Sequence, residues 1–259
     1  MIDWLLLAYP FVLGACIGSF LNVCIYRWPA ELSVLRPRSR CGSCGQPVRW
    51  YHNIPVASWV ALRGRCRDCG ARISIQYPLI ELVTGVIWLA AVWRFGYDVE
   101  ALRSAVFLTL LLGIAMTDAR EMVIPDQFSL GGTAIGLALA ALPGGMPFTR
   151  ALIGAAVGYV LFWAVKIVAE KTLKKPALGV GDIHMMAMVG AFLGTAGAMM
   201  TIMLGSLAGL VIGVPLTKLR GQGAVLGTYL PLGVFLAVGA FITRIWGEAI
   251  LVWYVGLVS

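Results

Sequence analysis

Long apolar runs separated by short polar segments make up most of this chain. Several runs approach the roughly 20 residues that an α-helix needs to cross a bilayer. The pattern predicts eight membrane-spanning helices, at residues 4–26, 79–95, 101–117, 127–143, 149–169, 183–196, 198–216 and 229–256. Because 60% of the 259 residues are hydrophobic and only 12% are charged, a soluble fold of this size cannot bury its apolar surface. We therefore expect an all-α polytopic membrane protein.

The number of spans depends on residues 183–216. This stretch is almost continuously apolar, and only the small residues from Gly194 to Gly197 interrupt it. At about 1.5 Å per residue it is too long for one span and short for two. Seven spans would move the C-terminus to the other side of the membrane, but Asp118 and Asp182 would stay on one side in either case.

The basic residues are divided unevenly between the two sides of the predicted bundle. With eight spans, 16 of the 20 lysines and arginines lie on one side, in the segments 27–78, 118–127, 166–182 and 217–228. The positive-inside rule makes this side cytosolic. The net charge of +8 therefore sets topology and favours anionic lipid head groups, not nucleic acid, as neighbours. The first run has no basic residue before it and Arg27 directly after it, which indicates a retained span and not a cleaved signal peptide.

One sizeable polar segment, residues 28–77, separates the first two predicted spans. A segment of this length builds little hydrophobic core and usually needs a metal or disulfides to hold it together. We therefore divide the chain into a first transmembrane helix (1–27), a small cytosolic four-cysteine domain (28–77) and a transmembrane domain (78–259).

The polar segment contains two Cys-x2-Cys pairs. They are Cys41-Gly-Ser-Cys44 and Cys66-Arg-Asp-Cys69, with 21 residues between them and a glycine after each. Four thiolates at this spacing are typical of a structural, tetrahedral zinc site in a zinc-ribbon-like loop. Two disulfides are the alternative, but they need an oxidising compartment, and the arginines of the loop predict the cytosol. We predict bound zinc.

Two aspartates stand where predicted membrane helices meet the cytosol. Asp118 follows an apolar run, and Asp182 ends the sequence Gly179-Val-Gly-Asp182 before another. A carboxylate beside hydrocarbon is costly and suggests a functional site. Two carboxylates on the same membrane face suggest a catalytic dyad that shares one proton. Simple helix capping is the alternative for both, and it is the favoured interpretation for Asp126, which follows Pro125 and opens a helix.

These motifs together resemble the type IV prepilin peptidases, a family of intramembrane aspartyl proteases. The resemblance rests on Asp-x6-Pro-Asp from Asp118 to Asp126, on Gly-x-Gly-Asp ending at Asp182, and on the paired Cys-x2-Cys. The segments Gly18–Arg27 and Pro78–Glu81 also resemble family signatures, so the match covers nearly the whole chain.

The resemblance implies a function for each motif. Asp118 and Asp182 match the two catalytic aspartates, and the four cysteines match a cytosolic zinc loop. The family removes the short basic leader of type IV prepilins or pseudopilins after a glycine, at the cytosolic face of the bacterial inner membrane. Many members also methylate the new N-terminus with S-adenosylmethionine, for which no residue of this chain is predicted. One departure is His184, where the family usually has lysine.

Two other classes of function remain open at this point. A proton- or cation-coupled secondary transporter also uses intramembrane carboxylates, but usually near the midplane and within inverted repeats, and the chain shows no repeat. A non-catalytic assembly factor with a structural zinc loop is the other. Only a protease would lose substrate cleavage when one aspartate is changed.

Overall fold

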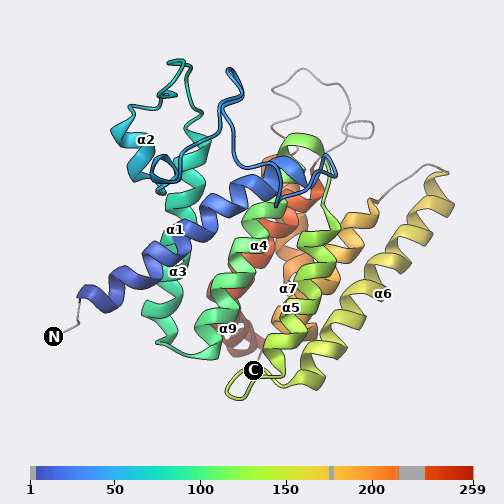
Figure 1. Ribbon diagram of the computed structural model, residues 1–259. Helices are drawn as coiled ribbons and strands as arrows, with labels where there is room; N and C mark the ends of the chain where they lie inside the picture. Colours follow the sequence, from blue (N-terminus) through green and yellow to red (C-terminus); the bar gives the residue numbers. More distant parts are fainter. Residues whose placement is uncertain (1–3, 175–177, 214, 216–230, 259) are drawn as a thin grey trace. The chain divides into compact units, whose positions relative to one another are not determined.

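The chain folds into helices joined by short connections. The computed structural model describes residues 4–174, 178–213, 215 and 231–258 (Figure 1). Its helices are α1 (Trp4–Arg27), η1 (Trp50–His52), α2 (Ala57–Ala61), α3 (Gln76–Phe95), α4 (Val99–Glu121), α5 (Asp126–Ala140), α6 (Phe148–Leu173), α7 (Val180–Ala208), the π-helical turn η2 (Gly209–Gly213) and α9 (Leu232–Val258). The described residues form no β-strand beyond two isolated bridges. The predicted all-α class is confirmed.

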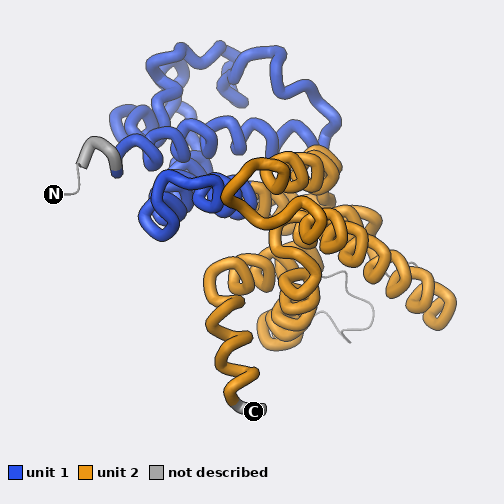
Figure 2. The backbone as a smooth tube through the Cα atoms, turned by 90° about the horizontal axis from the view of Figure 1, so that it is seen from below, with its two compact units in different colours: residues 1–109 blue, residues 110–259 orange. Residues whose placement is uncertain are grey.

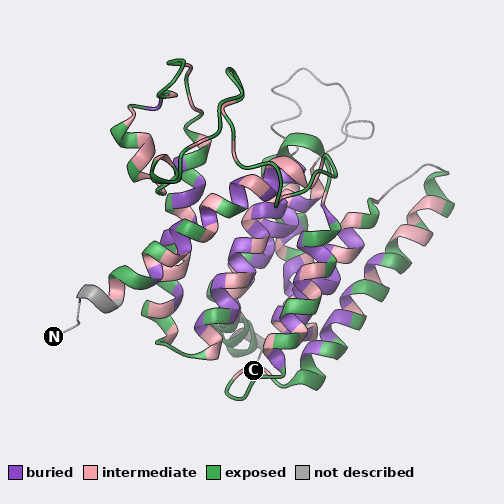
Figure 3. Ribbon diagram, viewed as in Figure 1, coloured by how far each residue is buried: buried purple, intermediate pink, exposed green. Residues whose placement is uncertain are grey.

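Six of the helical segments in the described part of the chain are long and apolar enough to cross a membrane. They are Leu7–Arg27, Gln76–Phe95, Val99–Glu121, Phe148–Leu173, Val180–Gly213 and Leu232–Gly256. Large apolar side chains lie exposed along them, as Ile153, Val160 and Val168 do on α6. Figure 3 shows exposed positions along these helices. Exposed apolar faces of this extent are expected where the surrounding solvent is lipid. The molecule is a multi-pass membrane protein.

The helices differ from the predicted spans at two places. The predicted span 127–143 is the 15-residue helix α5, which is shorter than the other apolar helices. The predicted spans 183–196 and 198–216 form one helical stretch that breaks at Gly194, where φ is 71° and ψ is −176°. A backbone with this φ favours glycine, so the break falls at the small residues that the sequence suggested. Residues 214 and 216 of that span, and residues 229 and 230 of the last one, lie outside the described residues.

Backbone contacts group the chain into two compact units, residues 1–109 and 110–259 (Figure 2). The division predicted from the sequence, at residues 27 and 77, follows membrane topology and stays a prediction. The predicted cytosolic residues Lys175, Lys218 and Arg220 lie outside the described residues.

Within the first unit, α1 packs against α3 through small residues. A Cβ atom at Gly14 would lie 2.7 Å from the Thr84 carbonyl oxygen, and one at Gly18 would lie 2.8 Å from Cα of Glu81. The two backbones therefore approach more closely than larger side chains allow. This packing fixes the start of α3 beside the end of α1.

Within the second unit, α7 is the central helix and packs against α5, α6 and α9. A Cβ atom at Gly154 of α6 would clash with the backbone of Gly190, and one at Gly205 of α7 would lie 3.1 Å from Cα of Leu236. Gly154 and Gly205 therefore let neighbouring helices pack closely. Gly131 has no such role, because the nearest neighbour of a Cβ there would be 3.9 Å away.

Candidate functional site

Asp118 lies in the last turn of α4 and is 5% exposed. The helix ends at Glu121, where Met122 turns the chain with a left-handed φ of 53° and donates its N–H to the Asp118 carbonyl at 3.0 Å. The carboxylate oxygen Oδ2 of Asp118 accepts the backbone N–H of Val234 at 3.0 Å. Val234 lies in the first turn of α9, where free N–H groups and the helix dipole favour a negative charge. The N-terminus of α9 therefore holds this carboxylate.

Asp182 lies in the first turn of α7 and is 9% exposed. The two glycines before it leave room for different groups. A Cβ atom at Gly179 would lie 2.9 Å from Oδ2 of Asp182 itself, whereas one at Gly181 would lie 2.8 Å from Cβ of Ile124. Gly181 therefore lets another chain segment approach Asp182. Gly179 instead makes space for the carboxylate.

Ile124 connects the surroundings of the two aspartates. Cβ of Ile124 lies against Gly181, next to Asp182. At the other end of the side chain, Cδ1 lies against Gly233. A Cβ atom added at Gly233 would be 2.8 Å from this Cδ1 and 2.9 Å from Oδ2 of Asp118. The two carboxylates interact electrostatically with each other. Both predicted residues thus belong to one buried cluster, formed by the end of α4, the start of α7 and the start of α9.

Asp126, the third aspartate, lies at the edge of this region. It is the first residue of α5, as predicted, but Pro125 holds the N-cap position, and Oδ1 of Asp126 pairs with Nδ1 of His184 at 2.7 Å. The His184 ring also stacks on Tyr159, with the centroids 6.2 Å apart. Because the Asp126 side chain is 63% exposed, this pair contributes little to stability. It does tie the start of α5 to the start of α7.

Val234, Gly233 and Ile124 belong to this site, although their positions in the sequence do not indicate it. A backbone N–H has no signature in a sequence, and an isoleucine in an apolar chain carries no chemical signal. One local pattern could have indicated the start of α9: Pro231-Leu-Gly233 combines a proline with a glycine just before an apolar helix. That pattern would not have shown which side chain the helix N-terminus faces.

The four predicted cysteine ligands also come together. Their sulfur atoms all lie within 4.8 Å of one another, and the Sγ atoms of Cys41 and Cys69 are 3.8 Å apart. All four are free thiols, so the alternative of two disulfides is not what the structure contains. The cluster can hold a metal ion.

Each Cys-x2-Cys pair lies in the same kind of turn. Gly45 donates its N–H to the Cys41 carbonyl and Gly70 donates to the Cys66 carbonyl, both at 2.9 Å. The two glycines have φ values of 72° and 73°, respectively, which side chains rarely tolerate. The glycines after the cysteines therefore make the turns that aim each pair of thiols at one point.

The electrostatics of the cluster fit a cation. The backbone N–H groups of Cys44 and Ser43 lower the pKa of the Cys41 thiol to about 6. For Cys69, the backbone of Ala71 lowers the pKa, but the neighbouring thiols and burial together raise it to about 12. Several thiolates cannot coexist here without a positive charge between them. Four sulfurs about 2.3 Å from a tetrahedral zinc would be about 3.8 Å apart, and the Cys41–Cys69 separation agrees.

Two protein-family models match successive segments of the chain. The model of the bacterial peptidase A24 N-terminal domain matches residues 12–95, and that of the type IV leader peptidase family matches residues 105–214. No solved structure matches the chain.

Several curated proteins are similar over most of the chain, and three of them carry the name prepilin leader peptidase/N-methyltransferase. The protein of Pseudomonas putida is 34% identical, and the match covers 92% of this chain and 90% of the relative. That of Aeromonas salmonicida is 31% identical, with 99% and 96% covered. That of Myxococcus xanthus is 42% identical over 83% of this chain, and the match spans 64% of that relative.

Proposed function

This chain belongs to the type IV leader peptidase family, and we propose on that basis that it is a prepilin peptidase that also methylates its product. As a peptidase it removes the short basic leader of type IV prepilins or pseudopilins after a glycine. As a methyltransferase it then modifies the new N-terminal amine. Its partners are these substrates and the membrane lipids.

Asp118 and Asp182 are the catalytic residues of this proposal. The observation that supports them is that two buried carboxylates, at the end of α4 and the start of α7, lie in one cluster around Ile124, close enough for the charge of one to act on the other. Repulsion between close carboxylates favours a state in which the pair holds one proton. Such a pair combines a base and an acid in one site, which is what hydrolysis of a peptide bond requires.

The reaction needs no group beyond the dyad and water. The ionised aspartate accepts a proton from water while the protonated one donates its proton to the scissile carbonyl oxygen, and the water oxygen bonds to the carbonyl carbon. The carboxyl that is now protonated gives its proton to the amide nitrogen as the C–N bond breaks, and the other carboxylate takes a proton from a hydroxyl of the tetrahedral intermediate. The leader's new carboxyl group then loses its proton to the new amine. The products are the leader, with a carboxylate, and the mature chain, with an ammonium group, and the dyad again holds one proton.

Zinc is the metal that we assign to Cys41, Cys44, Cys66 and Cys69. Four thiolates and a separation that fits tetrahedral Zn–S bonds support this assignment. The ion is structural, because four protein ligands leave no position for water. It holds together a loop that has little hydrophobic core of its own.

The active site lies at the cytosolic face of the inner membrane in this proposal. Its support is the excess of basic residues near Asp118 and Asp182 in the sequence. None of the comparisons supports the transporter alternative, and the curated relatives are named for peptidase and methyltransferase activities.

Co-expression with a prepilin-like substrate tests the function directly. Mass spectrometry of the substrate N-terminus should show loss of the leader and one added methyl group on the new terminal amine. An intact leader in the presence of well-expressed wild-type protein would contradict the peptidase assignment. A cleaved but unmodified terminus would contradict only the methyltransferase part.

A further inference from the structure

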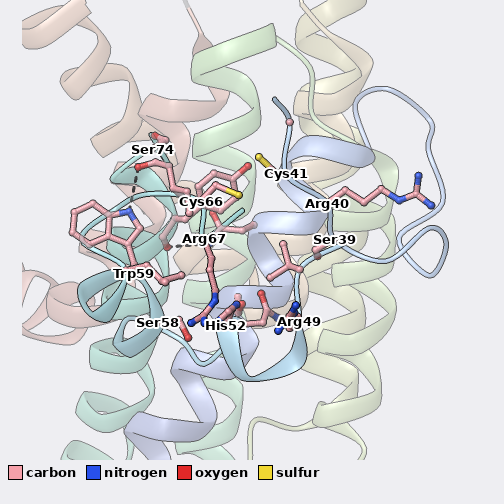
Figure 4. Close-up of a pocket in the computed structure, with 18 of the residues that line it drawn as sticks. Ser39, Arg40, Cys41, Arg49, His52, Ser58, Trp59, Cys66, Arg67 and Ser74 are labelled. Carbon is pink, nitrogen blue, oxygen red and sulfur yellow. Dashed lines mark hydrogen bonds between the residues drawn. The ribbon is translucent and has the colours of Figure 1, made fainter. Parts of the chain in front are cut away.

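The first unit contains a cavity of about 500 Å³, lined by residues between Ser19 and Glu81 (Figure 4). Neither Asp118 nor Asp182 belongs to that lining. The contacts described above for these two carboxylates all come from the second unit. The second unit also contains a lysine, Lys166 of α6, whose contacts lead to one of them.

Lys166 is directed toward the chain segment that enters α7. Its ammonium nitrogen Nζ donates to the carbonyl oxygen of Leu178 at 2.9 Å, and it pairs with Oε1 of Glu170, one turn later on α6, also at 2.9 Å. Its side chain is only 25% exposed. A lysine near the end of a membrane helix usually extends its ammonium group to water or to head groups. Two protein acceptors hold this one instead, and Leu178 lies four residues before Asp182.

The peptide unit between Leu178 and Gly179 connects Lys166 to Asp182. This peptide is trans, so its C=O and N–H groups point in opposite directions. The C=O group of Leu178 accepts from Lys166, and the N–H group of Gly179 donates to the carboxylate of Asp182. A Cβ atom at Gly179 would lie 2.9 Å from Oδ2 of Asp182, so the carboxylate lies directly against this residue. One planar unit therefore stands between the ammonium group and the carboxylate.

The contact between Asp182 and Gly179 follows from the way α7 begins. Gly179 is the N-cap residue, with φ of −68° and ψ of 145°, and Asp182 is the third residue of the helix. A carboxylate at this position can reach back to the N–H of the N-cap residue, as in a capping box. Glycine has no side chain that could fix the N-cap in return, and its backbone rotates with little steric resistance. The hydrogen bond from Lys166 supplies this restraint.

The positive charge of Lys166 strengthens the restraint. A hydrogen bond from a charged donor is about twice as strong as one between neutral groups, and a polarised C=O group makes the N–H group of the same peptide a better donor. Among the described residues, no ion pair involves Asp118 or Asp182, so the orientation of each carboxylate depends on backbone donors. The donor to Asp118, Val234, lies within α9, whereas Gly179 lies outside its helix and needs a restraint of its own.

We propose that Lys166 is a positioning residue of the peptidase, which holds the carboxylate of Asp182 in its working orientation through the Leu178–Gly179 peptide. This inference rests on the proposed peptidase function. Lys166 takes no part in the proton transfers of the dyad. Its loss therefore slows the chemical step and leaves substrate binding largely unchanged. A lysine that only sets topology or covers the surface of α6 would affect neither.

Cleavage of a prepilin-like substrate by purified full-length variants in detergent tests this role. Lys166→Met keeps the apolar stem but removes the ammonium group. It should lower kcat at least about tenfold and change KM less than about threefold, because a small misplacement of a catalytic group has a large effect on rate. Lys166→Arg keeps a charged donor and should restore most of kcat. Lys171→Met is the matched control, because it removes the same charge from the last turn of the same helix, where the side chain is exposed.

Glu170→Gln separates the two contacts of the ammonium group. It removes the ion pair but leaves the hydrogen bond to Leu178, so kcat should stay within about threefold of the wild-type value. A loss as large as that of Lys166→Met would assign Lys166 to the ion pair with Glu170 and overturn the proposal.

The midpoint of thermal unfolding of each variant separates misplacement of Asp182 from misfolding. If Lys166→Met does not fold, Lys166→Gln takes its place, because glutamine is neutral and too short to reach Leu178. A wild-type kcat in a folded neutral variant, a loss that arginine does not restore, or misfolding of both neutral variants would overturn the positioning role and leave the peptidase function standing. Failure of the wild type to cleave would instead overturn the proposed function.

Discussion

The backbone N–H of Val234 donates to Oδ2 of Asp118 at 3.0 Å across 116 residues of sequence. This contact places the N-terminus of α9 beside the end of α4. Gly233 makes it possible, since a Cβ atom there would lie 2.9 Å from the same oxygen and 2.8 Å from Cδ1 of Ile124. The start of α9 is therefore part of the proposed catalytic site.

Gly233→Ala should reduce the turnover of substrate at least about tenfold. The added methyl group displaces either the Asp118 carboxylate or Ile124, and overpacking of this kind costs about 1–3 kcal/mol. Gly256→Ala in the same helix is the control, because nothing lies within 4 Å of a Cβ there. The rate of leader removal by purified protein in detergent measures the effect. Equal rates for both variants would show that α9 does not position Asp118.

Asp118→Asn and Asp182→Asn should each abolish cleavage, because an amide can neither accept a proton from water nor share one with its partner. Asp126→Asn should keep most of the activity, since the His184 pair is exposed and an exposed pair contributes about 0–1 kcal/mol. The mass of a co-expressed substrate reports cleavage, and the amount of each variant in the membrane controls for expression. Substantial cleavage by either of the first two variants would remove that residue from the dyad.

The contact between Gly181 and Ile124 can be tested with a pair of substitutions, in which the second relieves the clash that the first creates. Gly181→Ala should slow cleavage, because its Cβ would lie 2.8 Å from Cβ and 3.2 Å from the carbonyl oxygen of Ile124. Adding Ile124→Gly should restore part of the rate, because glycine has no Cβ and so relieves the first of these clashes. A double-mutant cycle on cleavage rates measures the coupling. Gly131→Ala is the control, with its nearest neighbour 3.9 Å away, and purely additive effects would contradict the link through Ile124.

The sequence predicted those parts of the site that carry chemical side chains at fixed spacing. Asp118, Asp182 and the four cysteines were all identified, because carboxylates beside apolar runs and paired Cys-x2-Cys motifs are rare without a function. The helix break at Gly194 was visible for a similar reason, since small residues interrupt an apolar run.

Contacts through the backbone or through ordinary apolar side chains could not be predicted. The Val234 N–H lies far from Asp118 in sequence, and only tertiary packing of α9 brings it there. The pairing of Asp126 with His184 also depends on the position of α5 relative to α7.

Purified protein should contain about one zinc ion per chain, because four thiolates form a complete tetrahedral site. Replacing Cys41 and Cys44 with serine should remove the zinc and unfold the loop around it. Cys16→Ser is the control, because Cys16 lies in α1 outside the cluster. Metal analysis by mass spectrometry measures the content. Metal-free protein with two disulfides, taken from intact membranes, would contradict both the zinc site and the cytosolic location of the loop.

Cysteine probes placed next to Glu121 and next to Lys174 should both react with a membrane-impermeant reagent from the cytosol, whereas a probe next to Gly145 should react from outside. The expectation follows from the distribution of basic residues, 16 against 4, which orients membrane helices strongly when the residues lie in short loops. Peptide mapping separates each added cysteine from the six natural ones. The cluster that Asp118 and Asp182 form around Ile124 requires the first two probes to agree, because the two positions follow and precede these residues at the same end of the bundle. Labelling of the Glu121 and Lys174 positions from opposite faces would place a hydrocarbon layer of about 30 Å between the carboxylates. No proton can be shared over that distance, and the aspartyl protease mechanism would fail with it.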